Sequence, residues 1–271
     1  MPLDVVSLAQ RCAVVPERTD SPERAAELMW RDGAAVLTGI GTDEVSAGKI
    51  AALVLGDGLL GAGRPIEVTD GGGMDKRRYA DAARKMMPLH TDGFAYGAAA
   101  PDVFFLVCAT PSPGDGHSFL VDQAALLDSL AESPDGAELA MFIREHVVDQ
   151  SEPGAVHSAL GPVALALPSG VRAIRRSLDV RPVDDEPNPA YVSRMLTLWQ
   201  GLLDTVGALA ERFVVGEGEA LAIDNTRLAH GRDGYTRPGR SLWRCWAWTD
   251  RAGSVPDGEL WSDTRMLFGA V

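Results

Sequence analysis

Apolar residues fall in short runs along most of the chain, and glycine, proline and other turn residues separate these runs. Runs of about 4–8 residues rich in valine, isoleucine, leucine and aromatic residues are typical of β-strands. On this pattern we predict strands at 34–39, 103–109, 118–121, 163–167, 171–180, 219–223 and 242–248.

Apolar residues at steps of three and four, with capping residues before them, predict helices between some of these strands. Ser21 caps a first helix that begins at Pro22 and runs to about Arg31, and Thr42 opens a second that reaches about Leu55. The longest helix follows Asn188 and Pro189. We interpret its apolar stripe as a packing face, and the stripe consists of Val192, Met195, Trp199, Leu202, Val206, Leu209 and Phe213.

Many short strands, with helices at the N-terminus and one inserted late, favour a mainly β fold with helices over a βα-alternating one. The expected architecture is a β-sandwich or jelly roll with helical additions. The chain has 271 residues, 46% of them apolar, and contains no repeat and no linker rich in proline or serine. We therefore treat residues 1–271 as a single domain.

The charge balance narrows the range of partners. There are 25 lysines and arginines against 38 acidic residues, a formal net charge of −13, which argues against nucleic acid or an anionic membrane as partner. The three cysteines include no C-x-x-C pair, so neither a disulfide framework nor a cysteine zinc site is expected. Neither a signal peptide nor an apolar run long enough for a membrane span is visible, which predicts a cytoplasmic protein acting on a small molecule. The sequence does not determine the oligomeric state.

The stretch from Gly56 to Pro88 reads as loop. Its segment 56–61 matches G-x-G-x-x-G, but a dinucleotide site needs a strand before the motif and a helix at its third glycine. Here the preceding segment reads as helix, and Pro65 follows closely after the motif, so we do not expect a dinucleotide site. The same stretch carries a basic cluster at 76–79.

Residues 88–97, PLHTDGFAYG, place His90 and Asp92 two positions apart. In an extended segment both side chains point the same way. A third ligand is available in His230, which follows a predicted strand and the pair 224–225, whereas we interpret His117 and His146 as surface or structural residues, and His157 is a weak candidate. Two histidines and one carboxylate form the facial triad that holds non-haem iron(II) and leaves coordination positions open.

Two arginines follow the third candidate ligand. Arg240 and Arg244 are separated by an even number of residues, so a strand would present both on one face. A guanidinium pairs bidentately with a carboxylate, which is what the binding of a 2-oxo acid near the metal would require.

With these motifs in place, the sequence resembles the iron(II)/2-oxoglutarate-dependent oxygenases of the taurine dioxygenase-like (TauD/TfdA) branch, the wider group of clavaminate synthase and carbapenem synthase. The resemblance runs from DGAAVLTG at 32–39 to RSLWRCW at 240–246 and so covers most of the chain. Its motifs are H-T-D-G at 90–93, G-D-G-H-S at 114–118, D-N-x-R-x-x-H-G-R at 224–232 and R-x-x-x-R at 240–244.

The resemblance implies a double-stranded β-helix, a distorted jelly roll, with flanking α-helices. It implies that His90, Asp92 and His230 hold iron(II), with 2-oxoglutarate and O₂ as cosubstrates. Arg240 matches the arginine that pairs with the distal carboxylate of 2-oxoglutarate. Ser118 stands where the family usually has a threonine whose hydroxyl helps to bind that carboxylate.

The implied reaction couples oxidative decarboxylation of 2-oxoglutarate to oxidation of an unactivated C–H bond. Hydroxylation is the default outcome, and desaturation, cyclisation and epimerisation are within the family's reach. Arg244 matches an arginine that meets an acidic group on the substrate in several relatives, so we expect a small anionic substrate, and the composition suggests bacterial specialised metabolism. The alternative for Arg244 is a salt bridge within the barrel.

Aromatic residues near the motifs complete the expected substrate pocket. They are Tyr79 in the basic cluster, Phe94 and Tyr96 beside the metal motif, and Trp246 on the arginine strand. For each of them the alternative is core packing. Two other function classes stay open at this stage: a zinc-dependent hydrolase that uses the same ligands, and a non-catalytic jelly-roll binding protein.

Overall fold

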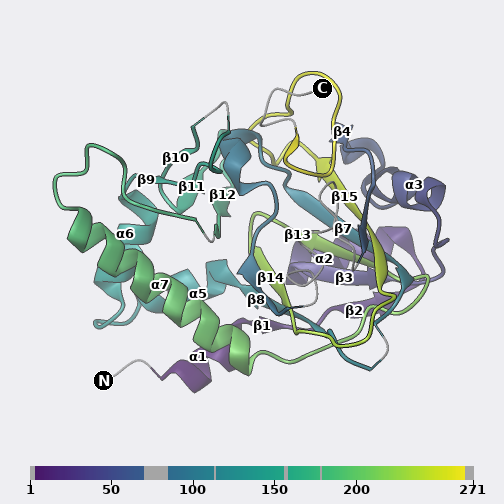
Figure 1. Ribbon diagram of the computed structural model, residues 1–271, viewed down its shortest axis with the longest axis horizontal. Helices are drawn as coiled ribbons and strands as arrows, with labels where there is room; N and C mark the ends of the chain where they lie inside the picture. Colours follow the sequence, from purple (N-terminus) through teal and green to yellow (C-terminus); the bar gives the residue numbers. More distant parts are fainter. Residues whose placement is uncertain (1–3, 70–84, 113, 156–157, 178, 266–271) are drawn as a thin grey trace.

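Two β-sheets face each other in the computed structural model, which describes residues 4–69, 85–112, 114–155, 158–177 and 179–265 (Figure 1). The larger sheet has the strand order β2–β3–β13–β7–β15–β4, and β5 also pairs with β15. Its strands are β2 (Glu17–Thr19), β3 (Ala34–Leu37), β4 (Gly61–Ala62), β5 (Ile66–Thr69), β7 (Val103–Thr110), β13 (Ala220–Asp224) and β15 (Ser241–Trp248).

The smaller sheet has the order β1–β8–β14–β6. Its strands are β1 (Ala13–Val14), β6 (Met87–His90), β8 (Ser118–Asp122) and β14 (Leu228–Arg232). Two separate hairpin-like pairs join β9 (Val148–Asp149) to β10 (Leu160–Gly161) and β11 (Ala164–Ala166) to β12 (Arg172–Ile174). Among the described strands every pairing is antiparallel except that of β2 with β3. The fold is thus the predicted jelly roll of two facing sheets.

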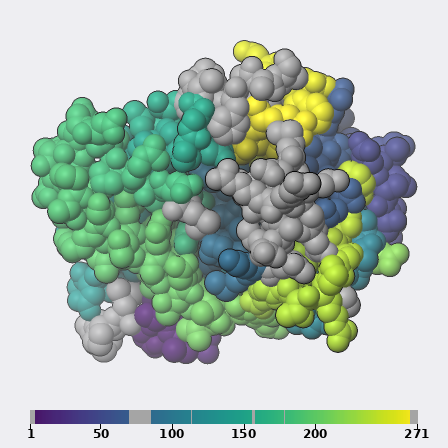
Figure 2. Space-filling view, in the orientation of Figure 1, coloured from purple at the N-terminus to yellow at the C-terminus, as the bar shows by residue number. Residues whose placement is uncertain are grey.

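Helices cover the outer faces of both sheets. Helices α2 (Pro22–Asp32) and α3 (Glu44–Leu55) pack on the larger sheet, while α1 (Val5–Cys12), α5 (Gln123–Ala131), α6 (Ala137–Glu145) and α7 (Pro189–Leu209) cover the smaller one. Two short 3₁₀ turns, η1 (Gly56–Gly58) and η2 (Phe94–Ala99), complete the helical elements of the described residues. In Figure 2 the green and teal atoms, the colours of α5, α6 and α7 in Figure 1, form one side of the molecule.

The double cover explains why the central strands read as continuous apolar runs. In β13, Ala220 and Ala222 pack against α2 and α3, whereas Leu221 and Ile223 point into the space between the sheets. Because both faces of the strand are buried, the polar alternation expected of a half-exposed strand is absent. The inter-sheet core also contains Trp246 and Trp248 of β15.

The predicted helix starts are largely confirmed. Ser21 accepts a hydrogen bond from the backbone N–H of Arg24, and Pro22 is the first residue of α2. The second helix begins at Glu44, because Asp43 rather than Thr42 caps it and accepts from the N–H of Ser46. Both aspartate and threonine favour this position, so the pattern alone did not separate them.

The prediction of which residues of α7 are buried is wrong at the C-terminal end of the helix. Val192, Met195, Trp199 and Val206 are buried as predicted, but Leu203 is buried where Leu202 was expected, and Leu209 is 52% exposed. Phe213 lies beyond the end of the helix and packs between the sheets.

Three strand predictions also need correction. Residues 56–88 were expected to be loop, but β4 and β5 lie there and extend the larger sheet beyond β15. Strand β14, which carries His230, was not predicted as a separate strand. Strand β12 ends at Ile174 rather than near 180, because the backbone that follows it pairs with the segment of the H-T-D-G motif instead. The N–H of Thr91 donates to the carbonyl of Arg176, and the N–H of Arg176 donates to the hydroxyl of Thr91.

Within the described ranges, none of the helices has both the length and the apolar character needed to cross a bilayer. The basic cluster at 76–79, with Tyr79, lies outside the described residues, as does His157.

Candidate metal centre

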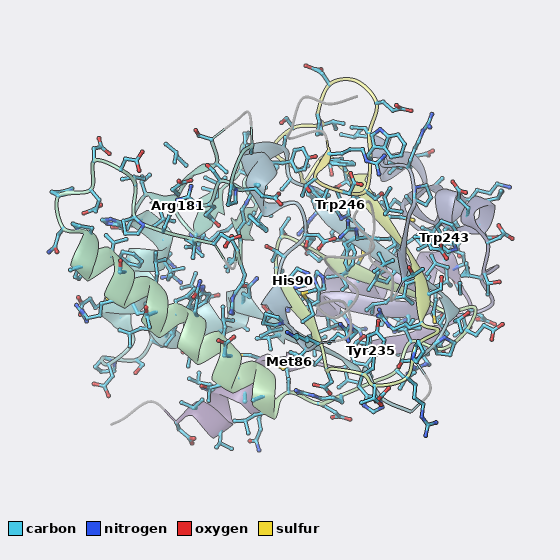
Figure 3. The ribbon with its side chains drawn as sticks, in the orientation of Figure 1. Met86, His90, Arg181, Tyr235, Trp243 and Trp246 are labelled. Carbon is cyan, nitrogen blue, oxygen red and sulfur yellow. The ribbon has the colours of Figure 1, made fainter. Side chains whose placement is uncertain are left out.

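Two neighbouring strands of the smaller sheet bring two histidines together. Strands β6 and β14 are antiparallel, and His90 and His230 are direct partners across the pair. Their ring centroids are 4.2 Å apart. The labelled His90 lies near the middle of the molecule, between α7 and β15 (Figure 3).

The segment after β6 is held so that His90 and Asp92 face the same way. Thr91, between them, points to the opposite side and accepts a hydrogen bond of 2.9 Å from the backbone N–H of Arg176. Gly93 has a φ of +65°, and a Cβ at this position would lie 2.5 Å from a side-chain carbon of Pro101. The turn therefore requires glycine, which agrees with the H-T-D-G motif.

Asn225 fixes the backbone of Asp92. Its Oδ1 accepts from the N–H of Asp92 at 3.0 Å, and its Nδ2 donates to the carbonyl oxygens of Asp92 and Pro101 at 2.9 and 2.8 Å. The asparagine is buried, so these bonds join the turn before β14 rigidly to the segment after β6.

Three ligand atoms converge at this point. His90, Asp92 and His230 each offer one atom, and these atoms lie within 4.8 Å of one another. Oδ1 of Asp92 is 3.5 Å from Nε2 of His90 and 3.7 Å from Nε2 of His230. In the part of the chain that the structure describes, this is the one group of three histidine, cysteine or carboxylate side chains with such an arrangement.

Both imidazoles present Nε2 to this point. His90 Nδ1 lies 3.0 Å from the carbonyl oxygen of Pro88, to which it donates when Nε2 carries the free electron pair. His230 stacks on Phe104 with ring centroids 4.6 Å apart. Burial lowers the pKa of His230 to about 3; the charges of His90 and Arg244 act in the same direction, and the charge of Asp92 opposes them. The ring of His230 is therefore neutral near pH 7 and able to bind a metal.

The two carboxylate oxygens of Asp92 have different partners. Its Oδ1 faces the histidines, while its Oδ2 accepts a hydrogen bond of 2.6 Å from the indole Nε1–H of Trp246. Burial by itself would raise the pKa of Asp92, but the nearby charge of Arg244 and the two histidines outweigh it and hold that pKa below the usual range. The side chain is thus ionised although it is only 6% exposed.

The donor set fits iron(II). Two imidazoles and one carboxylate, with the thiols of the three cysteines buried elsewhere in the chain, match the ligand types of the facial triad. The buried Nδ1 of His230 has no hydrogen-bond partner, so stacking on Phe104 rather than a hydrogen bond orients this ring.

A cavity of about 630 Å³ opens beside the three ligand atoms and includes them in its wall. Ser118 at the start of β8 also lines it, and so do Arg240 and Arg244. The two arginines reach the same cavity, although only Arg244 lies on β15 and Arg240 precedes its first residue. Its volume is in the range of small-molecule sites.

Arg244 is anchored beside the candidate ligands. Its Nε–H donates to the carbonyl oxygen of Ser262 at 2.7 Å, and its guanidinium lies 5.2 Å from the ring centroid of Trp246. The terminal nitrogen NH1 is 3.5 Å from Oδ2 of Asp92. The arginine therefore has an internal carboxylate near it, and that carboxylate is itself a candidate metal ligand.

Of the aromatic residues expected in the pocket, the three that the structure describes, Phe94, Tyr96 and Trp246, are not among those that line the cavity. Trp246 is 1% exposed and contacts Asp92, and Tyr96 packs edge-on against it and donates from its hydroxyl to the carbonyl of Asp263. Phe94 lies in η2, where its carbonyl oxygen accepts from Arg175. Tyr79 lies outside the described residues. The side chains of Trp246 and Tyr96 thus pack against each other, as the sequence-based alternative of core packing describes.

Other residues near the site carried little signal in the sequence. Asn225 belongs to the D-N-x-R-x-x-H-G-R motif, but its contact with Asp92 depends on the fold. Phe104 looked like any strand residue, and Glu152 lies in a loop with no motif. Of the remaining histidines, His146 pairs with Glu186 at 3.0 Å, in line with a structural role.

Comparison with known families gives a match over most of the chain. Residues 14–246 match the model of the taurine catabolism dioxygenase TauD, TfdA family. A curated relative, a uridine-5′-phosphate dioxygenase from a Streptomyces species, is 27% identical over 154 residues, which is 54% of this chain and 55% of the relative. The match thus spans about half the length of this relative.

Solved structures agree on the fold. An asparagine oxygenase superposes with a TM-score of 0.60 at 20% identity, over 86% of this chain and 84% of that one. PvcB from Pseudomonas aeruginosa gives 0.56 at 18% identity, over 84% and 79%. The non-haem iron oxygenase OrfP, solved with Fe and alpha-ketoglutaric acid, gives 0.55 at 15% identity, over 84% and 78%. At these sequence identities, the similarity to the solved structures establishes the fold alone.

Proposed function

The chain belongs to the TauD/TfdA family of dioxygenases, and from this premise we propose that it is an iron(II)- and 2-oxoglutarate-dependent oxygenase acting as a single domain over residues 1–271. The observation that carries the proposal is the convergence of one atom each from His90, Asp92 and His230 at the wall of a small-molecule cavity. In this proposal the three residues hold the iron.

Arg240 and Ser118 would hold the distal carboxylate of 2-oxoglutarate. Both line the cavity that contains the triad, and both also border a smaller hollow beside it. A guanidinium and a hydroxyl together offer the bidentate pairing and the extra donor that a carboxylate takes. Iron(II) with 2-oxoglutarate and O₂ supplies the oxidising power for an unactivated C–H bond, with succinate and CO₂ as coproducts.

The remaining residues of the site then orient the carboxylate of Asp92 and exclude water from the cavity. Trp246 and Arg244 engage Oδ2 of Asp92, which leaves Oδ1 for the iron. The apolar wall residues Leu120, Leu221 and Leu242 keep water from the reacting carbon. Hydroxylation is the default outcome, with desaturation or cyclisation as variants that depend on how the substrate is held.

The substrate in this proposal is a small molecule with an anionic group, used in bacterial specialised metabolism. Arg244 supports this, because its guanidinium lines the cavity next to the triad and retains donors beyond the one given to Ser262. A zinc-dependent hydrolase with the same ligands is disfavoured by the family match, and it would leave Arg240 without a cosubstrate to bind. A non-catalytic jelly roll would have no need for three converging ligand atoms.

The test is the visible charge-transfer band that iron(II) and 2-oxoglutarate give when both bind one triad without oxygen. The wild-type protein should show it, and His90→Ala or His230→Ala should abolish it, because a triad that lacks one ligand binds iron poorly. His146→Ala is the matched control, since this histidine pairs with Glu186 away from the cavity. An unchanged band in both triad variants would mean that the ligands are misassigned.

A further inference from the structure

The cavity wall carries acidic side chains that the proposed iron and 2-oxoglutarate sites do not use. They are Glu67, Glu152 and Asp263. Glu67 is exposed and accepts from the hydroxyl of Ser241 at 2.8 Å, and Asp263 forms an ion pair with Arg265 at 2.7 Å. Glu152 differs from both, because its Oε2 is buried and has no hydrogen-bond partner.

The backbone around Glu152 is fixed. The carbonyl oxygen of Glu152 accepts from the N–H of Ala155 at 3.0 Å across Pro153 and Gly154, and the φ of +83° at Gly154 fits a type II turn. The preceding residue, Ser151, holds the loop on both sides: its N–H donates to Asp149 and its hydroxyl accepts from the N–H of Ala159, each at 2.8 Å. A carboxylate without a partner is therefore held at the cavity by a well-bonded turn.

This position is costly for a carboxylate in the absence of a ligand. Burial, and then the negative charge of Asp179, raises the pKa of Glu152. Glu152 is partly buried as a residue, but its buried Oε2 is disfavoured in the charged form unless a cation or a hydrogen-bond donor meets it. In the described part of the chain no such group reaches it, although arginines lie elsewhere on the same cavity wall.

We propose that Glu152 binds a positively charged nitrogen of the substrate, an ammonium or a similar basic group. The inference rests on the proposed oxygenase function and refines its substrate class. Glu152 reaches this cavity from the turn after β9, whereas Arg244 reaches it from β15.

The substrate thus meets charges of opposite sign within one cavity. An anionic group pairs with Arg244, and a cationic nitrogen pairs with Glu152, so the favoured substrate is a zwitterion such as an α-amino acid or a compound that contains one. Two fixed charges orient a small molecule better than one, because they leave less freedom to rotate about the line between them. The C–H bond to be oxidised is then presented between the two anchors.

The experiment compares compounds that differ only in the cationic nitrogen. The probes are L-amino acids at millimolar concentration, each with the carboxylic acid in which hydrogen replaces the ammonium group, and uridine 5′-phosphate as an anion without a cationic nitrogen. Binding is followed by the shift of the anaerobic iron(II)–2-oxoglutarate band and, independently, by calorimetric titration of the metal-free protein. The variants are Glu152→Gln, which keeps the shape and removes the charge, and Glu67→Gln, which removes the same charge from a partnered, exposed residue of the same cavity.

We expect zwitterionic probes to bind and their matched acids to bind more weakly. Glu152→Gln should weaken the zwitterions by at least about tenfold, since a buried charge loses its partner, while Glu67→Gln should leave them nearly unchanged. Thermal unfolding of each variant checks that it is folded, and Glu152→Asp, which keeps the charge, replaces Glu152→Gln if the latter does not fold; it should weaken binding through the shorter reach.

Three results would overturn the proposal: zwitterion binding that is unaffected by Glu152→Gln, binding confined to compounds without a cationic nitrogen, or no binding by any amine of the panel. These are distinct from failure of the proposed function, which would appear as the absence of the charge-transfer band in the wild-type protein before any probe is added.

Discussion

The indole of Trp246 donates a hydrogen bond of 2.6 Å to Oδ2 of Asp92. The tryptophan comes from β15 and the aspartate from the turn after β6, strands of different sheets, so the bond crosses the interior of the jelly roll. It occupies one carboxylate oxygen and leaves the other facing the two histidines. Trp246 is therefore a positioning residue for a candidate metal ligand rather than a residue of the cavity wall.

Replacing Trp246 by phenylalanine should weaken iron(II) binding. The variant keeps an aromatic ring in the core but removes the donor, so Asp92 loses the bond that orients it. Loss of such a supporting partner costs about 10–100-fold in metal affinity. Competition with a chelator, read through the charge-transfer band, measures the effect.

Trp248→Phe is the matched control. This second tryptophan is also buried on β15, but its Nε1–H donates to the carbonyl of Ala99. It should lose a similar amount of stability and keep its iron affinity. If the two variants lost iron affinity equally, the effect of Trp246→Phe would come from altered core packing and not from the lost hydrogen bond to Asp92.

Asn225→Ala should destabilise the metal-free protein and also weaken iron binding. The substitution leaves the buried N–H and C=O of Asp92 and the C=O of Pro101 without their partner, at a cost on the order of 1–3 kcal/mol for a group left unpaired. Denaturant unfolding measures the first effect and chelator competition the second.

Asn188→Ala is the control variant, which should lose stability without losing iron affinity. Asn188 caps α7, where its Oδ1 accepts from Tyr191, and loss of such a cap costs about 1 kcal/mol. Iron affinity should remain at the wild-type value in this variant. If Asn225→Ala changed only the unfolding free energy, the clamp on Asp92 would have no bearing on the metal.

Arg240→Ala should raise the KM for 2-oxoglutarate much more than the KM for the oxidised substrate. Loss of one partner of a desolvated charge pair costs about 2–5 kcal/mol, at least tenfold in affinity. Arg240→Lys should recover only part of it, because lysine lacks the bidentate geometry. Comparable changes in both KM values would assign Arg240 to the structure of the barrel.

Arg244→Ala should separate 2-oxoglutarate turnover from substrate oxidation. We expect the variant to keep the iron–2-oxoglutarate band and to form succinate, while product formation is lost because the anionic group of the substrate has no anchor. The ratio of succinate to oxidised product measures this. Since NH1 of Arg244 is 3.5 Å from Asp92, the competing outcome is loss of the band itself, which would mean that the arginine serves the metal site and not the substrate.

Local patterns were sufficient for much of the fold. The Ser21–Pro22 helix start and the strands around β7, β13 and β15 follow from capping chemistry and apolar runs, which depend on neighbouring residues. The pattern was less informative where long-range pairing decided the outcome. Strands β4 and β5 exist because β15 offers them an edge, and β12 stops early because Arg176 pairs with Thr91.

For the site, the sequence by itself determined the candidate ligand set: H-x-D predicts two side chains on one side of an extended segment, and the even spacing of Arg240 and Arg244 predicts that both face one way, although Arg240 precedes β15. Only the tertiary structure decided what surrounds them. It aligned His230 opposite His90, turned Trp246 toward Asp92 and left Glu152 at the cavity without a partner. The physical reason is range. Periodicity fixes the direction of a side chain relative to its own backbone. A partner far away in the sequence, such as Trp246 for Asp92, is chosen by how the two sheets pack and by which buried polar groups still need a hydrogen bond.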